Sequence, residues 1–173
     1  MSLSLLSAQD IKSKNLFEKP INAKYLNVGK KDYMIVFYGY VGCTKVCSPI
    51  LYNLNRFYSS DSFSKFEPFV DFIFVNLLPN VSNELPDQFA KSFNPKFSGV
   101  YLTQKEISGI DKELHLYLDN RANEPFDIDH SDHIYLIKRE KNGKFILINT
   151  YTTHPLNQSL ILDDLSEYIS VSH

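Results

Sequence analysis

Two short, mostly apolar runs mark the first predicted elements of the chain. Residues 32–38 and 69–78 contain few polar positions and do not alternate regularly between apolar and polar residues. Runs of this length are typical of strands buried on both faces of a sheet. The Asn142-Gly143 pair is a strong hairpin signal between two later apolar runs. The further strands are expected at residues 97–102, 133–139 and 144–150.

Between and after these strands, apolar residues recur at helical spacing. Ser48 followed by Pro49 is an N-cap and first-turn signature that opens one helix. Thr103 and Glu106 have the spacing of a capping box, which predicts the start of another. The helices are expected at residues 48–59, 86–93, 103–114 and 155–169.

The order of these elements predicts the fold class. Strands and helices alternate first, and a β-hairpin and a closing helix follow. Alternating elements favour parallel strands covered by helices, whereas a hairpin adds antiparallel strands. The sequence therefore predicts an α/β protein with a mixed central sheet flanked by helices, a late β-hairpin and a C-terminal helix. This is the thioredoxin-like arrangement.

The length of the chain and the positions of its breaker residues predict a single domain. The chain has 173 residues, and a domain near that size buries roughly 70% of the surface that its unfolded chain exposes. Residues 1–30 are polar and irregular, with Pro20 and Gly29 as breakers. We expect an N-terminal arm over residues 1–30 with little secondary structure, and the domain over residues 31–173.

Charge and hydropathy limit the classes of partner. The formal net charge is −2 and the basic residues are scattered, so no basic stripe predicts nucleic-acid binding. No segment reaches the ~20 apolar residues that a membrane-spanning helix needs. The 13 Phe and 11 Tyr residues, without any Trp, predict an aromatic core.

The only two cysteines, Cys43 and Cys47, lie between a predicted strand and a predicted helix. Open α/β sheets place their chemistry at this end of a strand. A helix amino terminus or a cation such as Lys45 lowers a thiol pKa, and the thiolate is the form that attacks disulfides and binds soft metals. Redox chemistry, Cu(I) binding with an added imidazole, and a structural disulfide all remain open. Structural zinc is disfavoured because it normally takes four protein ligands.

His130 is the best candidate for an imidazole beside the cysteines. It lies in the loop that enters the predicted strand at residues 133–139. His133 is the rival, but it alternates with Tyr135 and Ile137, which indicates a structural or surface role. The other histidines have no comparable setting: His115, His154 and His173.

Five stretches of the chain resemble the Sco/SenC family of copper proteins, which have a thioredoxin-like fold. The run from Val36 to Cys47 resembles the family signature Phe-x-Gly-Tyr-Thr-x-Cys-x-x-x-Cys. The other stretches follow in the family's order over residues 20–170: FVNLLP at 74–79, FNPKFSG at 93–99, DHS at 129–131 and IYLI at 134–137.

The resemblance implies a copper chaperone for assembly of the cytochrome c oxidase copper centre. It implies Cys43, Cys47 and His130 as ligands of copper, as Cu(I), Cu(II) or both. The partner would be an oxidase subunit or another copper carrier protein. The resemblance also implies the bacterial periplasm, with a membrane anchor outside this chain, or alternatively the mitochondrial intermembrane space.

Two departures from the family pattern keep other functions open. Thr44-Lys45-Val46 stands where Pro-Asp-Val is common, and Leu78-Pro79 stands where Asp-Pro is common. Both changes make the site less anionic, and a nearby cation favours thiolate while opposing a bound metal cation. The alternatives are a thiol–disulfide oxidoreductase, with Cys43 and Cys47 as a redox pair, and a non-catalytic interaction module with a structural disulfide.

Overall fold

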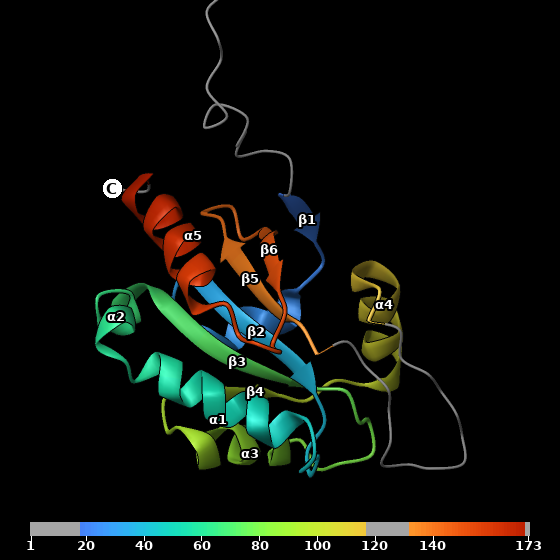
Figure 1. Ribbon diagram of the computed structural model, residues 1–173. Helices are drawn as coiled ribbons and strands as arrows, with labels where there is room; N and C mark the ends of the chain where they lie inside the picture. The colour runs from blue at the N-terminus through green and yellow to red at the C-terminus, as the bar shows by residue number, and fades with distance from the viewer. Residues whose placement is uncertain (1–17, 117–131, 172–173) are drawn as a thin grey trace, which may run out of the picture.

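The computed structural model describes residues 18–116 and 132–171. Its centre is a six-stranded mixed sheet in the order β1-β6-β5-β2-β3-β4 (Figure 1). β2, β3 and β4 are parallel, and β5, β6 and β1 add antiparallel pairings. The strands are β1 (Lys19–Ile21), β2 (Tyr33–Gly39), β3 (Val70–Asn76), β4 (Ser98–Val100), β5 (Ile134–Arg139) and β6 (Phe145–Tyr151).

Helices cover both faces of the sheet and divide the core into two layers. Alternate residues of β2 enter different layers: Phe37 packs with α1, α3 and α5, whereas Tyr38 packs with η1 and α4. Figure 1 shows α1 and α5 on the near side of the strands. The helices are η1 (Lys24–Val28), α1 (Cys47–Tyr58), α2 (Asp61–Ser64), η2 (Glu67–Phe69), α3 (Leu85–Phe93), α4 (Gln104–Leu114) and α5 (Gln158–Val171).

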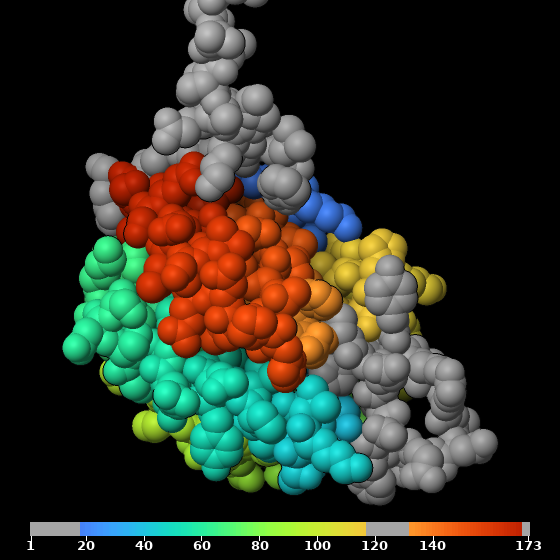
Figure 2. All heavy atoms as spheres, viewed as in Figure 1, coloured from blue at the N-terminus to red at the C-terminus, as the bar shows by residue number. Residues whose placement is uncertain are grey.

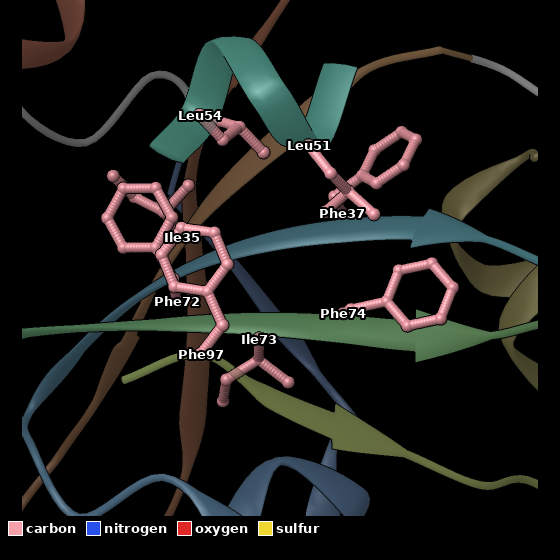
Figure 3. A pocket seen from close by; sticks show the side chains of 8 residues that line it. All are labelled: Ile35, Phe37, Leu51, Leu54, Phe72, Ile73, Phe74 and Phe97. Atoms are coloured by element: carbon pink, nitrogen blue, oxygen red, sulfur yellow. The ribbon is translucent and has the colours of Figure 1, made fainter. Parts of the chain in front are cut away.

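Aromatic rings fill the layer beneath α1, as the composition predicts. Phe72 and Phe97 stack with centroids 5.0 Å apart, and Tyr58 meets Phe72 edge-on at 5.1 Å. A cavity of about 10 Å³ remains beside them (Figure 3). A water needs about this much space and two or more polar partners, but the lining is apolar: Ile35, Phe37, Leu51, Leu54, Phe72, Ile73, Phe74 and Phe97. The cavity is therefore a small packing gap.

The structure confirms the predicted mixed sheet, the late hairpin and the C-terminal helix. Gly143 in the hairpin turn has a φ of 81°, the left-handed conformation that favours glycine. Thr103 and Glu106 form the predicted capping box at the start of α4. The hairpin turn and the capping box each depend on residues that are close together in the sequence, which explains why local patterns predicted them.

Three expectations about secondary structure need correction. Little structure was expected in residues 1–30, yet within the described residues 18–30 the structure has η1, and β1 pairs with β6. The first long helix begins at Cys47, one residue before the expected N-cap Ser48. The last helix begins at Gln158 rather than near Pro155, because Asn157 Oδ1 accepts the Leu160 N–H as a cap.

Candidate functional site

The cysteine loop, residues 40–46, lies at one edge of the sheet. It follows the carboxyl end of β2, and the parallel strand β3 ends beside it, with Gly39 opposite Asn76. β5 runs antiparallel to β2 and begins at the same edge, with Ile134 opposite Phe37. In turn, Tyr151 at the end of β6 pairs with Ile134. The ends of four strands therefore lie at the edge of the sheet that carries the cysteine loop.

Hydrogen bonds fold the cysteine loop back onto the first turn of α1. The Ser48 N–H and Oγ both donate to the Cys43 carbonyl, at 3.1 and 3.0 Å. Gly42 has a φ of 85°, so the turn before Cys43 favours glycine. Ser48 thus ties the loop to the helix instead of acting as the N-cap that the sequence predicted.

Neither cysteine forms a disulfide, and both are buried. Cys43 exposes 5% of its surface and Cys47 exposes none. A Cβ added to Gly39 would lie 3.0 Å from Cys47 Sγ, closer than ordinary van der Waals contact. The absence of a side chain at Gly39 is therefore what leaves room for the Cys47 sulfur.

The two thiols differ in their electrostatic surroundings. Burial raises the pKa of Cys43, but hydrogen bonds from the Tyr40 side chain and from Cys47 outweigh it and bring that pKa below its ordinary value. One of these bonds runs from the Cys47 N–H to Cys43 Sγ at 3.3 Å. Burial raises the pKa of Cys47, and the hydrogen bond between the two side chains adds to this. Cys43 is therefore the thiol that ionises first.

Tyr40 is a site residue to which the sequence interpretation gave no role. Its place in the family-like run was visible, but nothing local indicated that its side chain turns toward Cys43. Lys45 was expected to favour the thiolate, yet its side chain is exposed. The lower pKa of Cys43 comes from hydrogen bonds within the loop and the helix start.

The structure describes only one of the two candidate histidines. His130 lies outside the described residues, so its role as a ligand stays a prediction. His133 lines a surface pocket with Tyr135 and Leu147, which pack in the core layer opposite that of the cysteines. Within residues 18–116 and 132–171, no three His, Cys, Asp or Glu side chains are grouped so that they could hold a metal ion.

A hydrogen-bonded cluster at the same edge was missed by the sequence interpretation. His154 Nδ1 lies 2.8 Å from Asp132 Oδ2, and Thr153 Oγ1 donates to the same oxygen at 3.0 Å. Burial raises the pKa of Asp132, but these hydrogen bonds outweigh it and hold the pKa below its ordinary value. Figure 2 shows the surface after β6 next to that of the start of α1. The pairing of β5 with β6 brings Asp132 and His154 together, and no sequence motif signals it.

Several solved structures are similar to this chain. ScoI of Arabidopsis thaliana, with copper bound, has a TM-score of 0.65 and 20% identity, and the match covers 84% of this chain and 89% of that chain. A SCO1/SenC family lipoprotein from Bacillus anthracis has a TM-score of 0.64 and 18% identity over 80% and 82% of the two chains. BsSco, described as having a disulfide switch and as a member of the Sco family of cytochrome c oxidase assembly proteins, has a TM-score of 0.59 and 15% identity over 79% of each chain.

These structures share the fold of the chain at low sequence identity.

The search of curated proteins found no match to this chain. Across the described residues, no helix combines the length and the apolar character needed to cross a membrane. The family model for SCO1/SenC matches residues 23–170, which is most of the chain and includes both cysteines. The chain therefore belongs to the SCO1/SenC family.

Proposed function

We propose that this protein is a copper chaperone that serves assembly of cytochrome c oxidase. The observation that carries the proposal is the pair of thiols in hydrogen-bond contact at the sheet edge of a SCO1/SenC protein. Two soft sulfur ligands suit Cu(I). Cys43 and Cys47 would hold the ion as thiolates, and His130 would supply the imidazole. Copper is the cargo, and it would leave by exchange onto cysteines of an oxidase subunit or another copper carrier.

The family resemblance and the solved relatives support this proposal. The Arabidopsis relative binds copper, and BsSco is described as belonging to a family of oxidase assembly proteins. A relative that is a lipoprotein supports attachment to a membrane through an anchor. We propose the bacterial periplasm as the compartment, with the mitochondrial intermembrane space as the alternative.

Copper titration of the anaerobically reduced protein tests the ligand set. We expect one Cu(I) per chain, with weaker binding in Cys43→Ser, Cys47→Ser and His130→Ala. His133→Ala is the matched control, because His133 lies on the face of the sheet opposite to the cysteines and should leave the affinity unchanged. Stoichiometric binding that survives all three ligand changes would overturn the assignment.

A thiol–disulfide oxidoreductase is the second candidate. The opposite pKa shifts of the two thiols favour it, because hydrogen bonds lower the pKa of Cys43 while burial raises the pKa of Cys47. The Cys43 thiolate would attack a partner disulfide, forming a mixed disulfide and releasing one partner thiolate. Cys47 would then lose its proton and attack the Cys43 sulfur, which releases the second partner thiolate. The pair would lose two electrons and the partner would gain them.

The two functions make different predictions for single variants. For the oxidoreductase, Cys47→Ser should trap the mixed disulfide with a partner, and His130→Ala should leave disulfide reduction unchanged. For the chaperone, His130→Ala should weaken copper binding. A redox titration without a reversible dithiol–disulfide couple would remove the oxidoreductase.

A further inference from the structure

Asn76 is a buried polar side chain beside the cysteine loop. It ends β3 opposite Gly39, and none of its surface is exposed. The Leu77 N–H donates to the Gly39 carbonyl at 2.7 Å, which is where backbone pairing between the two chain segments stops. Burial of an amide is costly unless both of its polar ends find partners.

Both ends of the Asn76 amide are satisfied by backbone groups of different segments. Its Oδ1 accepts the Val41 N–H at 3.1 Å, and its Nδ2 donates to the Leu78 carbonyl at 2.6 Å. The Asn76 side chain thus connects the end of β3 to the cysteine loop, beyond the last backbone hydrogen bond between the two segments. It also fixes the segment that leaves β3.

We infer that Asn76 is the positioning residue of the thiol pair. Val41 stands between Tyr40, whose carbonyl accepts the Cys43 N–H at 3.3 Å, and Gly42, whose φ of 85° turns the backbone before Cys43. The hydrogen bond to Val41 therefore restricts the backbone conformation of residues 40–42, which sets the position of the Cys43 side chain beside Cys47. The inference concerns the dithiol itself and also deepens the proposed copper function, since two sulfurs held together bind one ion better than two that move independently.

The required chemistry is specific to an amide. An ionised aspartate at position 76 would still accept the Val41 N–H, but it would place a second acceptor against the Leu78 carbonyl. A protonated aspartate has one donor and one acceptor, so it restores both bonds. Leucine has a similar shape and restores neither bond. The pair Asn76→Asp and Asn76→Leu therefore separates hydrogen bonding from packing.

Asn94 provides a matched control. It is also buried, and its amide also uses both ends: Nδ2 donates to Asn55 Oδ1 at 2.8 Å, and Oδ1 accepts the Lys96 N–H at 2.9 Å. Asn94 follows the carboxyl end of α3, and its partner Asn55 lies two turns beyond Cys47 in α1. Asn94→Leu should lower stability without disturbing the thiols.

The test is equilibration of the metal-free dithiol with glutathione. One glutathione disulfide oxidises the pair to a disulfide and yields two molecules of glutathione. In Asn76→Leu we expect the constant for disulfide formation to fall by about 5-fold and by no more than about 30-fold, because only the part of the hydrogen-bond energy that differs between the dithiol and the disulfide enters this constant. In Asn94→Leu it should change less than about twofold, while urea unfolding shifts in both.

Asn76→Asp provides a second test, which does not require the leucine variant to fold. Its constant, divided by that of the wild type at the same pH, should rise toward one as the pH falls and the carboxyl takes up a proton, and should fall as the carboxyl ionises. A constant unchanged or raised in Asn76→Leu, or an Asn76→Asp ratio that stays below one when the carboxyl is protonated, would overturn the inference. A wild type that binds no copper would remove the proposed function and leave this result standing.

Discussion

Replacing Gly39 with alanine tests how tightly the sheet holds the Cys47 sulfur. The new methyl group would lie 3.0 Å from Cys47 Sγ and 3.1 Å from ring carbons of both Phe37 and Phe74. Overpacking of this kind costs about 1–3 kcal/mol. Removing a glycine stabilises by about 0.4–1 kcal/mol through the unfolded chain. We therefore expect Gly39→Ala to lower the free energy of unfolding by roughly 0.5–2 kcal/mol.

A double-mutant cycle in urea isolates the contact with the sulfur. Cys47→Ala removes Sγ, so Gly39→Ala should cost less in the Cys47→Ala background than in the wild type. Residues in direct contact couple by about 0.5–3 kcal/mol, and we expect the low end of this range because the contacts with Phe37 and Phe74 remain. The measurement is urea unfolding of the reduced proteins, followed by circular dichroism.

Gly109→Ala is the control for the glycine substitution itself. Gly109 lies inside α4, and an added Cβ would meet nothing within 4 Å. Alanine there should stabilise the protein by about 0.5–1 kcal/mol. If Gly39→Ala is neutral or stabilising like this control, or if its cost does not change in the Cys47→Ala background, the reasoning about the sulfur pocket is wrong.

The remaining predictions concern ionisable groups. Because the pKa of Cys43 is lowered and that of Cys47 is raised, iodoacetamide should label Cys43 first as the pH rises. Tyr40→Phe should move the labelling of Cys43 to higher pH. Mass spectrometry of the peptides measures the order of labelling, and earlier labelling of Cys47 would contradict this prediction. Thr103→Ala should cost about 1 kcal/mol by removing the cap of α4. The pKa of Glu106 is lowered, chiefly by its hydrogen bonds to Thr103, so its contribution to stability is present above its ordinary pKa and is lost as pH falls. Urea unfolding at several pH values checks both statements, and a cap contribution independent of pH would contradict the second.

Local patterns predicted the elements whose signals lie within a few residues. β2 and β3 were visible as apolar runs, and the capping box of α4 was visible as a spacing. β1 was missed because its short segment becomes a strand only by pairing with β6, near the other end of the chain. The start of α1 was misplaced by one residue because Ser48 donates to the Cys43 carbonyl instead of capping the helix.

The sequence by itself determined the thiol pair, the strand before it, the helix after it and the family resemblance. These follow from residue types and spacing, which tertiary contacts do not alter. Only the tertiary structure decided that Cys43 is the more acidic thiol, that His133 belongs to the opposite face, and that Asn76 meets the cysteine loop. Burial, strand register and the direction of each side chain set these properties, and they depend on segments that are distant along the chain.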